Sequence, residues 1–256
     1  MNKRVALVTG ASSGLGEVFA RKLAARGYDL ILVARRADRL HAIAAELPVH
    51  VDALAADLAT EAGVAAVEQA IRDCPALELL VNNAGFGSLK RFWEADLAGQ
   101  EHMHQVHVMA TMRLTHAALK AMVPRSRGGV INVSSVASFG QSEGNVSYCS
   151  TKTWMTSFSL GLDIELRGAG SPVKVQALCP GFTVTEFHQT LGVDRATIPR
   201  FLWLTSDFVV DASLHALDRG KALVIPDWKY KIVVFFMKHL PGALTRGVRP
   251  GRKGRV

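Results

Sequence analysis

The sequence predicts an α/β protein, doubly wound around a parallel β-sheet of about seven strands with helices on both faces. Apolar runs typical of strands buried on both sides alternate along the chain with helical patterns. No linker, repeat or low-complexity stretch interrupts this alternation. A chain of 256 residues, 49% of them hydrophobic, suffices to bury the core of one domain.

Each predicted strand is an apolar run that ends at a turn. The strands cover residues 4–9, 29–34, 49–55, 77–81, 130–133, 173–178 and 222–225. Helical patterns follow residue 16, cover residues 38–47, begin near residue 60, and cover residues 99–123, 146–167 and 207–218. In such sheets the ligand binds beyond the carboxyl ends of the strands, so the residues just after each strand are candidates for a site.

A glycine-rich turn joins the first strand to the first helix. It has the spacing Gly-x-x-x-Gly-x-Gly and contains Gly10, Ser12, Ser13, Gly14, Leu15 and Gly16. Glycines let the backbone approach a phosphate, and the helix N-terminus offers unpaired N–H donors and the positive end of the helix dipole. Between a strand and a helix, this turn predicts a dinucleotide-binding loop.

Residues after the second and third strands are expected at the adenosine end of that cofactor. Arg35 and Arg36 stand where a carboxylate would bind a free ribose 2′-hydroxyl, whereas arginine accommodates a 2′-phosphate. The two arginines therefore predict NADP(H). Asp57 and Leu58 follow the third strand; Asp57 either meets the adenine or caps the helix that begins near Thr60.

The turns after the fourth and sixth strands are expected at the same edge of the sheet. They contain Asn83, Ala84 and Gly85 in one turn, and Pro180, Gly181, Thr183 and Thr185 in the other. An asparagine and a glycine after a buried strand commonly form a turn. The common location is what makes these residues candidates for cofactor binding.

Ser135, Tyr148 and Lys152 are the candidate catalytic residues. A helix over residues 146–167 places Tyr148 and Lys152 one turn apart on one face. A tyrosine phenol has a pKa near ~10, and a neighbouring ammonium favours the phenolate and lowers that pKa. Tyr148 is therefore expected to exchange a proton with a substrate oxygen that Ser135 orients.

Other residue types limit the classes of function. His102, His104, His107 and His116 lie on one predicted helix, but no carboxylate or cysteine completes a ligand set, so no metal site is expected. The three cysteines are far apart and have no metal or redox spacing. No signal peptide or membrane-spanning run is present, which predicts a cytoplasmic protein in a reducing compartment.

The end of the chain is basic. The net charge is +8, and residues 228–256 contain lysines and arginines but no acidic residue. No nucleic-acid-binding motif accompanies them, so nucleic acid is not an expected partner. The interleaved aromatics and lysines predict either weak contact with a membrane surface or an extension that packs on the domain or on a subunit partner. Residues 186–205 have the composition of an apolar lid over the substrate.

Taken together, the motifs resemble the short-chain dehydrogenase/reductase family, whose members are single Rossmann-fold domains of about this length. The resemblance covers about residues 4–225. Its motifs are Thr9-Gly10-x-x-x-Gly14-x-Gly16, Asn82-Asn83-Ala84-Gly85, Asn132-Val133-Ser134-Ser135, Tyr148-x-x-x-Lys152 and Pro180-Gly181-Phe182-Thr183-Val184-Thr185, in the family's order.

The resemblance implies a role for each matched residue. Tyr148 is implied as the general acid/base, and Ser135 as the group that polarises the substrate carbonyl. Lys152 is implied to lower the Tyr148 pKa and to hold the nicotinamide ribose, and Thr183 and Thr185 to approach the nicotinamide and phosphates. Family members usually associate through their long helices, which implies a homodimer or homotetramer.

One residue departs from the family pattern. The family usually has an asparagine in the long fourth helix, where it anchors a water of the proton relay, and His107 occupies that position here. Histidine also donates and accepts hydrogen bonds, so a modified relay through His107 is one interpretation. The alternative is a weakened relay, in a slow enzyme or a protein that binds cofactor without turnover.

The sequence thus predicts an NADP(H)-dependent oxidoreductase that interconverts an apolar ketone or aldehyde with its alcohol. The catalytic domain is expected over residues 1–227, with the basic extension over residues 228–256. The competing hypothesis is a dinucleotide-binding regulatory or scaffold protein with little turnover.

Overall fold

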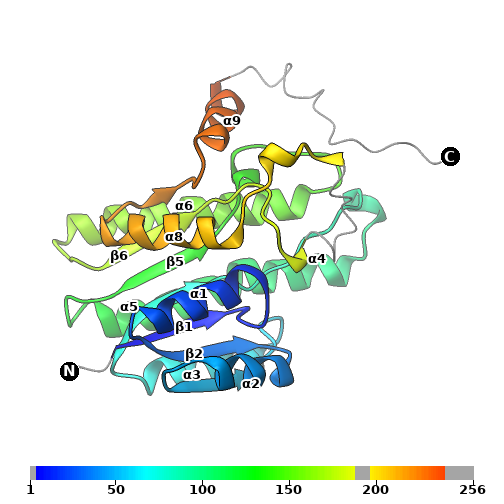
Figure 1. Ribbon diagram of the computed structural model, residues 1–256. Helices are drawn as coiled ribbons and strands as arrows, with labels where there is room; N and C mark the ends of the chain where they lie inside the picture. The colour runs from blue at the N-terminus through cyan, green and yellow to red at the C-terminus, as the bar shows by residue number, and fades with distance from the viewer. Residues whose placement is uncertain (1–3, 188–196, 240–256) are drawn as a thin grey trace.

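A computed structural model describes residues 4–187 and 197–239 of the chain (Figure 1). Its centre is a parallel sheet of seven strands in the order β3-β2-β1-β4-β5-β6-β7. The strands are β1 (Val5–Thr9), β2 (Asp29–Ala34), β3 (Val51–Ala55), β4 (Leu77–Asn82), β5 (Gly129–Val133), β6 (Lys174–Leu178) and β7 (Leu223–Val224). The predicted doubly wound fold is confirmed.

Helices cover both faces of this sheet (Figure 1). They are α1 (Gly14–Ala25), α2 (Ala37–Glu46), α3 (Glu61–Arg72), α4 (Leu97–His104), α5 (Thr111–Met122), α6 (Val146–Gly168), α8 (Ser206–Asp218) and α9 (Trp228–His239). Short 3₁₀ helices cover Phe92–Glu94, Val136–Phe139 and Arg200–Leu202. The strand order reverses between β1 and β4, which is where doubly wound sheets bind their ligands.

The alternating side chains of the strands build two separate cores. On one face, Ala6 and Val8 of β1 pack in one cluster with α1, α2 and α8, where Phe19 and Leu23 are fully buried. On the other face, Leu7 belongs to a cluster with α3, α5 and α6. Burial on both faces explains why the strands appear in the sequence as continuous apolar runs.

The single helix predicted over residues 99–123 is divided in the structure. It begins earlier, at Leu97, with the Asp96 carboxylate accepting a hydrogen bond from the Gly99 N–H as its N-cap. Between α4 and α5 the residues Gln105–Ala110 form a π-helix. A π-helical turn holds an extra residue and is frequently found at functional sites. This one contains His107.

The predicted C-terminal extension begins with α9, which projects beyond the sheet at the top of Figure 1. Its Tyr230 and Val234 are buried, and Tyr230 belongs to the same core cluster as α1 and α8. In the part of the chain that the structure describes, no helix is long and apolar enough to cross a membrane. Residues 188–196 of the predicted lid and the basic residues 240–256 lie outside the described residues.

Candidate active site

The glycine-rich turn after β1 has the backbone that a bound phosphate group requires. Gly10 and Gly14 adopt φ angles of +65° and +57°, in the left-handed region that favours glycine. A Cβ atom on Gly16 would collide with the Gly10 carbonyl. Ser13 is the N-cap of α1 but its side chain caps no backbone N–H, so the first N–H groups of α1 stay available to an anion. The loop therefore fits a dinucleotide.

The turn after β4 is bonded directly to this loop. The Asn83 side-chain amide donates to the Thr9 and Gly10 carbonyls over 2.9 and 3.3 Å. The Thr9 hydroxyl accepts hydrogen bonds from the Asn83 and Ala84 N–H groups, each over 3.0 Å. A Cβ on Gly85 would lie only 2.6 Å from Nε2 of His107. The structure thus brings the turn of residues 83–85 together with the glycine loop.

The two arginines after β2 differ in their surroundings. Arg36 donates to the Ser12 hydroxyl and carbonyl over 3.1–3.2 Å and pairs with Glu186 at 3.2 Å. Arg35 is exposed and has no hydrogen bond or ion pair with another described residue. Arg35 is therefore the guanidinium free to meet a phosphate, while Arg36 connects the glycine loop to the start of the lid.

The local role of Asp57 is a turn rather than a helix cap. Its carboxylate accepts a hydrogen bond from the Ala59 N–H over 3.0 Å, and Thr60 is the residue that caps α3, through the Gly63 N–H. The structure therefore excludes the helix cap as the role of Asp57. Its contact with the adenine stays a prediction. The Leu58 side chain is buried in the core cluster beneath α3, which leaves its backbone as the part that could face a ligand.

Ser135, Tyr148 and Lys152 come together at the carboxyl end of β5. Ser135 caps the 3₁₀ helix after this strand by accepting a hydrogen bond from the Ala137 N–H over 3.1 Å. Its hydroxyl also lies near enough to the Tyr148 phenol to lower the pKa of that phenol. Lys152 is buried, and its Nζ donates to the Val133 carbonyl over 2.8 Å and lies 5.7 Å from the centre of the Tyr148 ring.

Burial controls the proton affinities of this group. It raises the pKa of Tyr148 to about 12, against a smaller lowering by the neighbouring Ser135 hydroxyl. It lowers the pKa of Lys152 to about 8, because an ammonium is costly to bury. The sequence led us to expect Lys152 to lower the Tyr148 pKa. In the structure the Lys152 ammonium donates to the β5 backbone, and desolvation of the phenol is the largest influence on the Tyr148 pKa.

Neighbouring hydroxyls hold α6 against β5. The Ser134 hydroxyl donates to the Lys152 carbonyl over 2.8 Å and is paired with the Thr156 hydroxyl at 2.7 Å. Asn132 donates to the Ser159 hydroxyl over 2.9 Å. The sequence singled out the Asn132–Ser135 motif, but it gave no local signal for its partners on α6. These bonds fix the position of the helix that carries Tyr148 and Lys152.

His107 is buried and uses both ring nitrogens within the protein. Its Nε2 lies 3.1 Å from the Phe86 N–H, which can only donate, and its Nδ1 lies 2.9 Å from the Thr151 hydroxyl. Thr151 gives its own proton to the Tyr148 carbonyl, so Nδ1 is the protonated nitrogen of a neutral imidazole. Burial, and then the Lys152 charge, hold the His107 pKa well below its usual range. His107 thereby connects the π-helix to the helix of Tyr148.

The turn after β6 closes the site from the other side. Pro180 accepts a hydrogen bond from the Val136 N–H over 3.0 Å, next to Ser135. The Thr183 hydroxyl donates to the Gly181 carbonyl over 3.0 Å, and the Thr185 side chain lies against Gly14 of the glycine loop. Tyr230, which no sequence motif indicated, packs its ring against Gly181.

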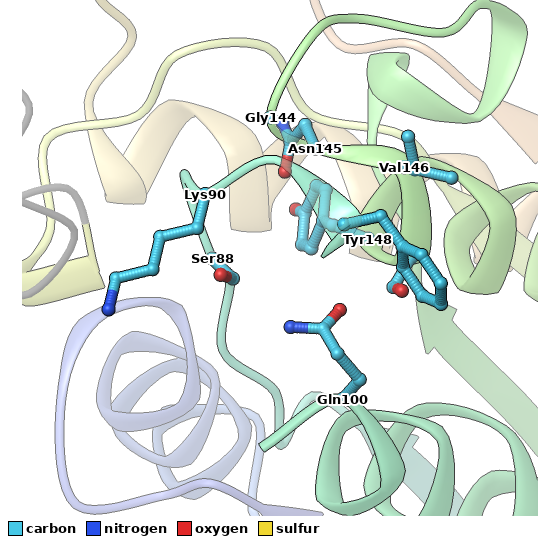
Figure 2. Close-up of a pocket in the computed structure, with 9 residues that line it drawn as sticks. Ser88, Lys90, Gln100, Gly144, Asn145, Val146 and Tyr148 are labelled. Atoms are coloured by element: carbon cyan, nitrogen blue, oxygen red, sulfur yellow. The ribbon is translucent and has the colours of Figure 1, made fainter. Parts of the chain in front are cut away.

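A narrow crevice lies beside Tyr148, and it has no room for a water molecule (Figure 2). Gln100 of α4 is buried, and its amide points toward Ser88 and Asn145, whereas Lys90 extends away from them. No described residue forms a hydrogen bond with the Gln100 side chain. The crevice is therefore polar, with one unpaired amide. Among the described residues no cluster suited to a metal ion is found, either at this site or elsewhere.

The chain matches known proteins over most of its length. A profile of the family described as short chain dehydrogenase matches residues 4–196. A probable NADP-dependent dehydrogenase of Haemophilus influenzae is 36% identical over 196 residues, which are 73% of this chain and 77% of that protein.

Solved structures give the same family over nearly the whole chain. A short-chain dehydrogenase from Sphingobium yanoikuyae in complex with NADPH is 34% identical, with a TM-score of 0.84 and 98% of each chain covered. The bulky-bulky ketone specific alcohol dehydrogenase of Comamonas testosteroni is 28% identical, with a TM-score of 0.80, covering 99% of this chain and 98% of that one. This protein therefore belongs to the short-chain dehydrogenase/reductase family of nicotinamide-dependent oxidoreductases.

Proposed function

We propose that the protein is an NADP(H)-dependent oxidoreductase that interconverts a ketone or aldehyde with its alcohol, with Tyr148 as general acid/base. The observation that carries this proposal is that Ser135, Tyr148 and Lys152 come together at the carboxyl end of β5, at the sheet edge where the glycine loop also follows its strand. The bound nicotinamide would supply or accept the hydride. Gly10, Gly14 and Gly16 would hold its phosphates, together with the N-terminus of α1.

Tyr148, Ser135 and Lys152 would each have a separate role in the proton transfer. With a pKa raised to about 12, the Tyr148 phenol is protonated at neutral pH and so is suited to donate to a carbonyl oxygen that becomes an alkoxide. The Ser135 hydroxyl, which lowers the pKa of that phenol, would orient the same oxygen. Lys152, with its pKa near 8, would carry its charge at neutral pH and hold the ribose hydroxyls.

His107 supports this arrangement as a positioning group. Both of its nitrogens are engaged, by the Phe86 N–H and by Thr151, so a water relay through its ring would first require one of these bonds to open. We propose that its contribution to turnover comes through the placement of Tyr148. The relay interpretation remains testable, because it predicts a changed pH profile in His107→Asn and the positioning interpretation predicts a uniformly lower rate.

The choice of NADP(H) rests on the free Arg35 and on related proteins. No carboxylate stands at the end of β2, and Arg35 is exposed and unpaired among the described residues. A guanidinium in this place binds a 2′-phosphate through charge-assisted hydrogen bonds. The NADPH complex of the Sphingobium relative and the NADP-dependent Haemophilus relative support the same cofactor.

We propose a largely apolar substrate. The Phe187 ring lies 5.9 Å from the Tyr148 ring, so an aromatic side chain lies beside the proposed proton donor. The Phe86 ring lies 5.9 Å from the His107 ring, which is itself 5.9 Å from the Tyr148 ring. The ketone-specific relative from Comamonas testosteroni supports a bulky carbonyl compound. NADPH or NADH consumption with a panel of apolar ketones and aldehydes tests the proposal. Turnover with NADPH supports it, and preference for NADH would overturn the cofactor assignment alone.

The competing proposal is a dinucleotide-binding regulatory or scaffold protein. It requires that the fold binds cofactor without meaningful turnover. The complete set of Ser135, Tyr148 and Lys152 argues against it, because a protein without chemistry has no need to bury a lysine beside a tyrosine. NADPH binding without turnover on a broad carbonyl panel would favour this alternative.

A homodimer or homotetramer in the cytoplasm is the proposed assembly and location. Apolar side chains of the π-helix, α5 and α6 are exposed, among them Met109, Met112 and Ile164. Their burial against a second copy would stabilise an oligomer. Light scattering coupled to size-exclusion chromatography measures the mass directly, and a monomer at micromolar concentration would overturn this proposal.

Helix α9 supports a second proposal, a weak contact with an anionic membrane surface. Its exposed apolar residues are Trp228, Ile232, Val233, Phe235 and Phe236. Lys231 and Lys238 are exposed on the same helix, and only basic charges follow in the sequence. This combination is typical of helices that lie on a bilayer. Co-sedimentation with anionic vesicles should decrease in Phe235→Ser/Phe236→Ser; equal sedimentation of the two proteins would exclude the contact.

A further inference from the structure

Tyr230 of α9 is a buried residue whose hydroxyl has two backbone partners. Only 3% of the residue is exposed. The Phe182 N–H donates to its Oη over 2.9 Å, and the Oη–H donates to the Leu202 carbonyl over 2.7 Å. Burial raises the pKa of Tyr230 to about 12, so the hydroxyl keeps the proton that it donates. Both hydrogen-bonding functions of the phenol are thus satisfied by backbone.

The ring of Tyr230 is in equally close contact with the turn after β6. A Cβ atom on Gly181 would collide with Cζ and both Cε atoms of the ring. The residue at position 181 therefore has to be glycine for Tyr230 to reach Phe182. The glycine of the Pro180-Gly181 turn therefore has a structural cause within this chain.

The two backbone partners lie on either side of the segment that the structure does not describe. Phe182 lies just before the predicted lid of residues 186–205, and Leu202 lies within its last part. Next to them the two ends are bonded to each other, because Leu204 N–H donates to the Phe182 carbonyl over 2.8 Å and Val184 N–H to the Leu204 carbonyl over 2.9 Å. Thr183, a candidate cofactor-binding residue, lies within this bonded segment and forms a bridge with Leu204.

Helix α9 is held in place by contacts on both sides of Tyr230. At its start, Lys229 Nζ donates to the Phe201 carbonyl over 2.7 Å. Toward its end, Lys238 Nζ lies 4.7 Å from the centre of the Phe139 ring, and Met237 packs against Gly140. The helix is therefore attached both to the lid end and to the segment that follows Ser135, so it spans the two sides of the active site.

We propose that Tyr230 is a positioning residue for cofactor binding: through its ring on Gly181 and its hydroxyl between Phe182 and Leu202, α9 fixes the two bonded segments that hold Thr183 in place. This inference rests on the proposed function and assigns a role to a helix that lies beyond the matched family region of residues 4–196. Thr183 is the residue that Tyr230 acts through.

The test compares Tyr230→Phe with Tyr28→Phe in the full chain. Tyr230→Phe keeps the ring on Gly181 but removes both hydrogen bonds. Tyr28 is half-buried at the opposite end of the sheet, has no hydrogen-bond partner for its hydroxyl among the described residues, and is the matched control. Tyr230→Phe should weaken NADPH binding about tenfold, the effect of one to two net hydrogen bonds. It should raise KM for NADPH with little change in kcat.

Hydrogen exchange supplies a readout that needs no cofactor. In the free protein, Tyr230→Phe should accelerate exchange of the Phe182 amide, and Tyr28→Phe should not. Fluorescence titration with NADPH then measures the affinity. Equal affinity of wild type and Tyr230→Phe, with NADPH bound by both, would overturn the positioning role while leaving the proposed function intact. A wild-type protein that binds no NADPH would overturn the proposed function, and the role of Tyr230 in it.

Discussion

Gly85→Ala perturbs the support beneath the proposed active site at one defined atom. The new Cβ would lie 2.6 Å from Nε2 and 3.1 Å from Cδ2 of His107. Gly85 is outside the left-handed φ region, so alanine brings no backbone strain of its own. The imidazole cannot easily move away, because hydrogen bonds with Phe86 and Thr151 hold its two nitrogens. Any destabilisation therefore reports on the position of His107.

The magnitude follows from overpacking and one lost hydrogen bond. Forcing an extra methyl group into a filled site costs about 1–3 kcal/mol. Displacing the imidazole from the Phe86 N–H costs about 0.5–1.5 kcal/mol more. Because each kcal/mol lowers Tm by roughly 2–4 °C in a chain of this size, the expected loss in Tm is roughly 3–18 °C.

Thermal unfolding followed by circular dichroism is the assay, with Gly161→Ala as the control. Gly161 is exposed in α6, and a Cβ there would meet nothing within 4 Å. That substitution should stabilise the protein by roughly 0.5–1 kcal/mol through helix propensity. If Gly85→Ala had the same Tm as wild type, the ring of His107 would not occupy the place described, and the argument for its positioning role would be refuted.

Three further predictions concern single side chains. The pKa of Lys152 is lowered from 10.5 to about 8, so between these pH values the native state binds fewer protons than the unfolded state. The free energy of unfolding should therefore rise from pH 8 to pH 10 in wild type, and less in Lys152→Met. Identical slopes of Tm against pH in the two proteins would contradict this. Arg35→Ala should weaken NADPH binding about tenfold and leave NADH binding unchanged in fluorescence titrations; an equal loss for both would exclude a 2′-phosphate contact. Gln100→Ala should change KM for the carbonyl substrate and not for NADPH in steady-state kinetics, because its unpaired amide faces the crevice beside Tyr148; unchanged KM values would separate the crevice from the substrate site.

The sheet and its ligand-binding edge could be predicted because each signal is local. A strand buried on both faces is a continuous apolar run, and residues that leave such strands must meet at one edge of a parallel sheet. Ser135 and Gly10 were therefore predictable neighbours although 125 positions separate them in the numbering. Tyr148 and Lys152 were predictable on one face of α6 because residues four positions apart lie one helical turn apart.

The π-helix could not be predicted from the pattern. One extra residue in a turn hardly alters the apolar periodicity of a long helix, so residues 99–123 gave the pattern of a single continuous helix. The direction of the Tyr148 pKa shift also could not be predicted from the sequence. Burial raises the pKa of Tyr148, whereas the sequence suggested that Lys152 would lower it. Burial of a phenol depends on every element packed around it.

The contacts of Tyr230 could not be predicted either, because they join residues far apart in the sequence. Its partners are Phe182 and Leu202, 48 and 28 positions earlier. The residues around it predicted an apolar and basic extension, and the sequence left open whether that extension packs on the domain. Only the path of the chain after β7 brings α9 onto Gly181. Contacts of this kind depend on the complete fold, not on a motif.

The most direct measurement of the central claim is turnover of Tyr148→Phe beside its NADPH affinity. The variant keeps the ring and loses only the phenol oxygen that is proposed to carry the proton. We expect NADPH to bind as in wild type and carbonyl reduction to fall by about 10²–10⁴-fold, the usual contribution of a general acid. Reduction at the wild-type rate by a folded Tyr148→Phe would contradict the assignment of Tyr148 and, with it, the account of this active site.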